Sequence, residues 1–249
     1  MINLKEVAAF FFARGADFVS PPEEIAAVFK TCHAYLFDWD GVWNRGEKGA
    51  DGVSPYSEPD SMGLNLLRFA YWLQNDKLPY VAIITGEPNP AAISLARREH
   101  FHAVYYKMKD KKEAWGHLTY NNKLQADSAL YVWDDVLDLN VAAEVGLSLM
   151  CRRGASPMLE RYARDQKVVD YITAHTGGEH AVREVCELLM GLVETWEAVV
   201  HERAQNSPRY QAYLYERNQL ATHFYTRDEE GQIVEASPAL GPAIKGLGV

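Results

Sequence analysis

The chain has 249 residues, of which 48% are hydrophobic and 24% charged, as expected for a folded protein of one large domain or slightly more. Its 34 acidic and 25 basic residues give a formal net charge of −9, which argues against nucleic acid or an anionic membrane as a partner. Cys32, Cys151 and Cys186 form no C-x-x-C pair, so we expect neither a disulfide framework nor a thiolate zinc site, and a cytoplasmic location. The apolar run 7–13 is too short and too charged at its ends for a signal peptide.

In chain order, the first thirty residues predict two short helices, because apolar residues recur at helical spacing and the Ser20–Glu23 stretch resembles a helix start. Short apolar runs then alternate with helix-length segments, a pattern that predicts a doubly wound α/β fold with a parallel sheet. The predicted buried strands are Ala34–Phe37, Tyr80–Ile84, Ala103–Tyr106 and Ala129–Trp133, and the helices between them are Met62–Leu73, Ala91–His100, Lys112–Leu118 and Leu137–Val145.

Two more short strands are expected at Gly146–Met150 and Val168–Ile172, followed by a helix from Ala181 to Trp196 that continues towards Tyr215. From Thr226 onwards, charged residues, Ser237-Pro238 and several glycines predict an irregular tail. We therefore divide the chain into an N-terminal helical extension (1–30), an α/β core (31–192) and a C-terminal helical extension with a tail (193–249).

Carboxylates follow two of the predicted strands. Asp38 and Asp40 come directly after the first strand, and Asp134, Asp135 and Asp138 come after the fourth. In an open parallel sheet, ligands bind outside the carboxyl ends of the strands, where the strand order reverses. Several carboxylates at that edge repel one another unless a cation neutralises them, and hard oxygen ligands suit Mg²⁺.

Two other strand ends supply groups that can hold a phosphate. Thr85-Gly86 offers a hydroxyl and backbone amides, and lysines 107, 109, 111 and 112 follow the third strand. A carboxylate such as Asp38 can attack phosphorus, while Asp40 can protonate the leaving oxygen and later activate water. Mg²⁺ and a lysine would offset the negative charge of the transition state.

These motifs, in this order, resemble those of the haloacid dehalogenase (HAD) superfamily of phosphatases. The segments 38–46 (DWDGVWNRG), 84–86 (ITG), 133–141 (WDDVLDLNV) and 177–185 (GGEHAVREV) are similar to motifs of its capless branch, which includes the 3-deoxy-manno-octulosonate 8-phosphate (KDO 8-P) phosphatases. The similarity extends over about residues 34–192. It implies a HAD-type sheet without a large cap domain and with a β-hairpin flap after the first motif, which we expect within 45–61.

The resemblance also implies residue roles. Asp38 would be the nucleophile and Asp40 the general acid/base, Thr85, Gly86 and Lys111 would bind phosphate, and Asp38, Asp134 and the backbone carbonyl of Asp40 would bind Mg²⁺. Lys111 precedes Asp134 by 134 − 111 = 23 positions, which fits the register of the branch, and Lys109 is the alternative. Asp135 and Asp138 are supporting residues that either bind the metal through water or position Lys111.

Three residues depart from the pattern: Trp133, Glu87 and His180 stand where glycine, arginine and glycine are usual, and each is expected to narrow or recharge the pocket. The branch forms tetramers, so the resemblance also implies a homo-oligomer.

The first functional hypothesis is a Mg²⁺-dependent phosphomonoester hydrolase acting through an aspartyl phosphate. Its expected substrate is a small metabolite, a sugar phosphate or a 2-keto-3-deoxy sugar acid phosphate. The alternative is a catalytically silent HAD-like domain that serves as an oligomerising or binding module. Phosphoryl transfer to an acceptor or carbon–halogen cleavage on the same scaffold is a third option.

Overall fold

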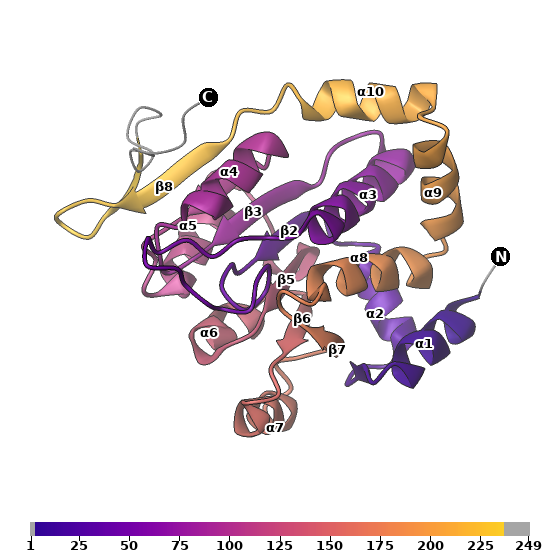
Figure 1. The fold of residues 1–249 in the computed structure, drawn as a ribbon, viewed down its shortest axis with the longest axis horizontal. Coiled ribbons are helices and arrows are strands. Elements are labelled where there is room, and N and C mark those ends of the chain that lie inside the picture. The colour runs from indigo at the N-terminus through magenta and orange to yellow at the C-terminus, as the bar shows by residue number, and fades with distance from the viewer. Residues whose placement is uncertain (1–2, 237–249) are drawn as a thin grey trace.

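The computed structural model describes residues 3–236, which fold around one nine-stranded sheet with the strand order β1-β7-β6-β5-β2-β3-β4-β8-β9 (Figure 1). The strands are β1 (Asp17–Phe18), β2 (Ala34–Phe37), β3 (Tyr80–Ile84), β4 (Ala103–Tyr105), β5 (Ala129–Trp133), β6 (Leu147–Arg152), β7 (Tyr171–Thr176), β8 (His223–Arg227) and β9 (Ile233–Glu235). The helices are α1 (Leu4–Ala13), α2 (Pro22–Phe29), α3 (Glu58–Asn75), α4 (Pro90–Arg98), α5 (Lys111–Asn122), α6 (Leu139–Ala142), α7 (Pro157–Asp165), α8 (Ala181–Leu192), α9 (Trp196–Ala204) and α10 (Pro208–Arg217), with short 3₁₀ turns η1 (Ala126–Ser128) and η2 (Val136–Asp138).

The centre of the sheet is parallel, as the alternation of apolar runs predicted. In the pairing register, Phe37 of β2 lies opposite Ile83 of β3 on one side and Val132 of β5 on the other. From β2 the chain adds β3 and β4 outward on one side, then crosses to β5 and adds β6 and β7 on the other. The strand order therefore reverses at β2, and the carboxyl ends of β2 and β5 lie side by side there.

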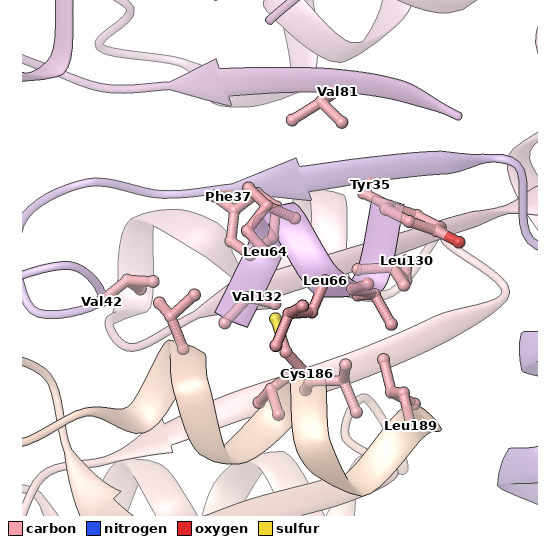
Figure 2. Packing of buried hydrophobic residues seen from close by; sticks show 14 of the residues in the cluster. Tyr35, Phe37, Val42, Leu64, Leu66, Val81, Leu130, Val132, Cys186 and Leu189 are labelled. Carbon is pink, nitrogen blue, oxygen red and sulfur yellow. The ribbon is translucent and has the colours of Figure 1, made fainter. Parts of the chain in front are cut away.

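Alternating residues of the strands supply two apolar cores, one on each face of the sheet. Tyr35 and Phe37 face one core, which α3 and α8 cover, while Ala34 and Leu36 face the other, against α5 and α6. Figure 2 shows side chains of the first core gathered between the sheet and Cys186 of α8. Because both faces are covered, the central strands are apolar throughout, which explains why they were predictable.

The N-terminal residues form the two predicted helices and one strand that was not predicted. α1 begins at a capping box in which Asn3 and Glu6 bond each other's backbone amides, and it packs on α8. β1 has only two residues and pairs antiparallel with β7, so it carries no periodic signal.

The C-terminal part differs from the prediction in two ways. The helix expected to run from Ala181 towards Tyr215 is divided, because Glu194 and Asn206 adopt left-handed backbone conformations that end α8 and α9. The tail predicted to be mostly irregular from Thr226 contains strand residues: β8, which ends at Arg227, pairs in parallel with β4, and β9 returns antiparallel to β8. Parallel pairing joins residues more than 100 positions apart, which no local pattern reveals. The part of the predicted tail from 237 to 249 lies outside the described residues.

The segment between β2 and α3 forms a loop, and the predicted β-hairpin flap is wrong. Its tip is held by the bond from the Gly49 amide to the Val53 carbonyl, 3.1 Å long, and no strand ladder follows. Instead, the Trp39 indole donates to the Ser54 carbonyl at 3.3 Å, and Ser54 is fully buried. A second strand would need free backbone carbonyl and amide groups here. The Ser54 carbonyl is already bonded to Trp39, and Pro55 has no backbone N–H to donate.

Within residues 3–236, no helix combines the length and apolar character needed to cross a bilayer. All three cysteines are buried and free.

Candidate active site

The candidate site lies where the strand order reverses. Asp38 follows β2, Asp134 follows β5, and one carboxylate oxygen from each of Asp38, Asp134 and Asp138 lies within 4.8 Å of the others. All three aspartates are buried. The prediction that carboxylates from the two strand ends would converge is therefore reproduced in the geometry.

Lys111 bridges two of these carboxylates. Its Nζ lies 2.5 Å from Oδ1 of Asp38 and 2.6 Å from Oδ1 of Asp138, and its side chain is 4% exposed. Lys111 is the first residue of α5, whose N-cap Asp110 accepts a hydrogen bond from the Lys112 amide. The cap fixes where α5 begins and so directs Lys111 inward, whereas Lys109 is exposed on the preceding loop.

Burial governs the electrostatics of the cluster. It raises the pKa of Asp38, and the ammonium of Lys111 partly opposes that rise. The pKa of Asp134 is also raised, first by burial and then by the charge of Asp38. Burial alone would lower the pKa of Lys111, but Asp38 and Asp138 raise it above its ordinary value, so this lysine stays charged.

Asp138 contacts Lys111 and helps to hold its ammonium in place. In addition to the Lys111 ammonium, it accepts hydrogen bonds from the Tyr131 hydroxyl and, at 3.2 Å, from the Asp135 amide. Asp135 points away: its side chain is 51% exposed and accepts from the Val136 amide at 2.7 Å. Of the two supporting residues, Asp138 is thus placed to position Lys111, and Asp135 lies at the rim.

Asp40 stands apart from the buried cluster, at the start of the loop. Its Oδ2 lies 3.3 Å from Nζ of Lys48, while its buried Oδ1 has no hydrogen-bond partner among residues 3–236. A carboxylate with one oxygen uncommitted and a side chain 23% exposed can exchange a proton with a group entering from solvent.

The loop after β2 turns tightly at Gly41, whose φ is +87°. A Cβ at this position would collide with the Asp134 carboxylate, so only glycine lets the backbone pass so close to it. Asn44 closes the turn by donating to the Trp39 carbonyl at 3.2 Å and accepting from the Gly46 amide at 2.8 Å. Gly177, in the last of the four motifs, packs its backbone directly on Gly41 and Asn44.

Thr85 and Gly86 follow β3, the strand next to β2. Thr85 is buried, and its carbonyl accepts from the Met108 amide at 3.1 Å, which ties this strand end to the segment that leads to Lys111. The predicted phosphate-binding residues therefore come from adjacent elements at the same edge of the sheet.

The donor set fits a divalent cation. Neither carboxylate oxygen of Asp134 has a hydrogen-bond partner among the described residues, although the guanidinium of Arg153 forms an ion pair with one of them. Buried carboxylates of this kind require a counter-charge. Oxygen ligands from Asp134 and Asp38 suit Mg²⁺, which keeps several waters and takes few protein ligands.

Sequence reasoning missed three residues of the site: Arg153, Lys48 and Tyr131. Arg153 comes directly after β6, so the rule applied to the other strand ends would also have selected it. Lys48 lies in an irregular loop, and Tyr131 lies inside an apolar strand run, so neither carries a sequence signal.

The three departures from the motif pattern have different outcomes. Trp133 does not narrow the pocket, because it is fully buried and its indole donates to the Ser148 hydroxyl at 2.8 Å, inside the core. Glu87 is exposed beside Gly86. His180 lies at the start of α8, where its Nδ1 is 3.1 Å from the Ser57 hydroxyl, at the beginning of α3.

Comparison with known proteins supports the resemblance. The chain is 34% identical over 110 residues to the 3-deoxy-D-manno-octulosonate 8-phosphate phosphatase of Yersinia pestis, a match covering 44% of this chain and 55% of that protein. The enzyme of Escherichia coli strain K12 matches with the same identity and coverage. The chain thus spans about half the length of the curated relatives it matches. No family model matches the sequence.

Solved structures match over more of the chain. A putative HAD superfamily (subfamily III A) hydrolase from Legionella pneumophila has 27% identity and a TM-score of 0.61, covering 73% of this chain and 94% of that one. The KDO 8-P phosphatase of Moraxella catarrhalis, solved with magnesium, phosphate and KDO, has 26% identity and a TM-score of 0.61, covering 73% and 98%. The protein therefore has the α/β fold of the HAD phosphatases and resembles the KDO 8-P phosphatases.

Proposed function

We propose that this protein is a Mg²⁺-dependent phosphomonoesterase that releases phosphate from a small sugar phosphate through an aspartyl-phosphate intermediate on Asp38. The observation that carries the proposal is the buried bridge from Lys111 to Asp38, next to the Asp134 carboxylate that lacks hydrogen-bond partners. A nucleophilic carboxylate, a fixed cation and a second carboxylate facing it are the groups that phosphoryl transfer to an aspartate requires.

In the first step, the Asp38 oxygen that Lys111 does not engage attacks phosphorus, and the bond from phosphorus to the leaving oxygen breaks. Asp40, which follows two residues later, gives its proton to that oxygen so that the sugar leaves as an alcohol. Lys111 and the backbone amides around Gly86 bind the phosphoryl oxygens and stabilise the charge that they gain.

In the second step, Asp40 is a carboxylate and takes a proton from water. The water oxygen attacks phosphorus, the bond to Asp38 breaks, and phosphate leaves with Asp38 restored as a carboxylate. Asp138 and Tyr131 act at a distance from phosphorus, by holding the Lys111 ammonium against Asp38.

Asp38, Asp134 and the backbone carbonyl of Asp40 would hold the magnesium ion. The ion would supply positive charge to a phosphoryl oxygen and to the two aspartates, which otherwise repel the incoming phosphate.

The substrate class is proposed from the comparisons: the relatives in Yersinia pestis and Escherichia coli are named KDO 8-P phosphatases. We therefore propose a 2-keto-3-deoxy sugar acid phosphate as the first compound to test, in a cytoplasmic homo-oligomer. Light scattering after size-exclusion chromatography would measure the oligomeric state, for which the resemblance predicts a tetramer.

The test is phosphate release from a panel of sugar phosphates and sugar acid phosphates, with Mg²⁺ and with chelator. Asp38→Asn should abolish release, and Asp40→Asn should slow it by at least about a hundredfold. Asp165→Asn, the same change on the exposed surface of α7, is the control and should keep full activity. Full activity in Asp38→Asn would refute the assignment of Asp38 as the nucleophile. If the wild type releases phosphate from none of the compounds, the silent-domain alternative is favoured.

A further inference from the structure

Arg153 contacts the proposed metal-binding carboxylate. It follows β6, the neighbour of β5, and its Nη2 forms an ion pair with Oδ2 of Asp134. Its Nη1 lies 3.6 Å from Oδ2 of Asp135, so the guanidinium lies across the acidic pair. Among residues 3–236, Arg153 is the cation that pairs with Asp134, because the bridge of Lys111 goes to Asp38 and Asp138.

The loop after β2 leaves room for this guanidinium. Cβ atoms on Gly41 or Gly46 would both meet Nη2 of Arg153, the second at 3.2 Å. Both glycines have positive φ values, +87° and +77°, so the two turn residues nearest Nη2 of Arg153 carry no side chain that would block its contact with Asp134.

The guanidinium is held at that place by charge alone. Within the described residues, the guanidinium of Arg153 makes two ion pairs and no further hydrogen bond, and the side chain is 34% exposed; the backbone carbonyl of Arg153 accepts from the Ser156 amide at 2.9 Å. Its neighbour Arg152 is held differently, by an ion pair to Asp17 at 2.7 Å and a hydrogen bond to the Thr173 carbonyl at 2.9 Å. Arg153 can therefore leave Asp134 without breaking a hydrogen-bond network or opening the core.

We propose that Arg153 is the counter-ion of the metal site: it neutralises Asp134 when no divalent ion is bound, and the ion has to displace it. The inference rests on the proposed function for the metal site but assigns a role to a residue outside the HAD motifs. The negative charge on Asp134 costs free energy when it is buried without a partner, so a resident cation stabilises the metal-free protein. The same cation competes with Mg²⁺ and raises the magnesium concentration at which the site fills.

The test is a magnesium titration by calorimetry, with thermal unfolding in chelator and in saturating Mg²⁺, all at pH 8. Arg153→Gln should bind Mg²⁺ about tenfold more tightly than the wild type. It should also unfold about 3 °C lower in chelator and at the wild-type temperature in saturating Mg²⁺. Arg161→Gln, an equal change of charge on the exposed surface of α7, should match the wild type in every measurement.

Equal or weaker magnesium binding by Arg153→Gln would overturn the proposal and would make Arg153 an orienting partner of Asp134 in the loaded site. An unchanged unfolding temperature in chelator would overturn it as well. If Arg153→Gln does not fold, Arg153→Lys takes its place: a shorter side chain without the planar fork should bind Mg²⁺ more tightly than the wild type does. Asp134→Asn should abolish binding in every background. If it does not, the metal site of the proposed function is wrong, a failure distinct from that of the Arg153 proposal.

Discussion

The bridge made by Lys111 is expected to have a large and pH-dependent effect on stability. Lys111→Met keeps most of the side-chain volume but removes the ammonium that lies 2.5 Å from Asp38 and 2.6 Å from Asp138. Removing one partner of a buried ion pair costs about 3–5 kcal/mol because it leaves a buried charge without compensation. We expect a loss of that size in the free energy of unfolding at pH 8 without metal.

Lower pH should reverse much of this loss. Burial raises the pKa values of Asp38 and Asp134, so the native state binds protons that the unfolded state releases, and stability rises as the pH falls. If the variant binds one extra proton in the native state, the change from pH 8 to pH 5.5 contributes about 3 kcal/mol. Saturating Mg²⁺ at pH 8 should also restore part of the lost stability, because the ion replaces the positive charge of the missing ammonium.

The assay is urea unfolding at pH 8 and pH 5.5, with and without Mg²⁺. Lys112→Met is the matched control, because Lys112 is the next residue and forms an exposed pair with Glu144. A loss in Lys111→Met no larger than in Lys112→Met would refute the reasoning. A loss of the same size at both pH values would show that lost packing, rather than uncompensated charge, causes it.

Two further predictions concern Gly41 and His102. Gly41→Ala should abolish magnesium binding in a calorimetric titration, because its Cβ would displace the Asp134 carboxylate; a variant with wild-type affinity would contradict the close approach of the loop. Burial lowers the pKa of His102 to about 4, and its Nδ1 accepts from the Val81 amide at 3.1 Å, so the native state holds this imidazole neutral. Between pH 7 and pH 5 the unfolded state gains a proton that the native state does not, so stability falls with pH. The free energy of unfolding, measured with urea, should therefore fall by about 2 kcal/mol more in the wild type than in His102→Gln. Equal losses in the two proteins would refute the assignment of a neutral His102.

The central strands and the residues that follow them were predictable for a physical reason. Strands covered on both faces are apolar throughout, so the residue at which the apolar run stops, such as Asp38 or Asp134, marks the edge where ligands bind. Lys111 was selected over Lys109 by its spacing from Asp134, and the structure buries Lys111 and exposes Lys109. The contact of Arg153 with Asp134 depends on the pairing of β5 with β6, which spacing within one motif does not encode.

The C-terminal elements were harder to predict because their partners are distant in sequence. The Tyr210 hydroxyl donates to Asn65 at 3.0 Å, and the Trp72 indole donates to Glu216 at 2.6 Å, which fixes α10 across α3. Neither helix shows a periodicity that identifies the other as its partner.

The pairing of β8 with β4 has a consequence for the order in which the sheet can form during synthesis. The carbonyl of Tyr225 accepts from the Tyr106 amide at 3.0 Å, and the His223 amide donates to the His102 carbonyl at 2.9 Å. A nascent chain that has emerged only as far as α8 already contains both flanks of β2 but leaves the outer edge of β4 open. Open strand edges can pair with other chains, so we expect the edge of β4 to be vulnerable until the 223 − 192 = 31 residues from Leu192 to His223, about 100 Å when extended, have brought β8 to it.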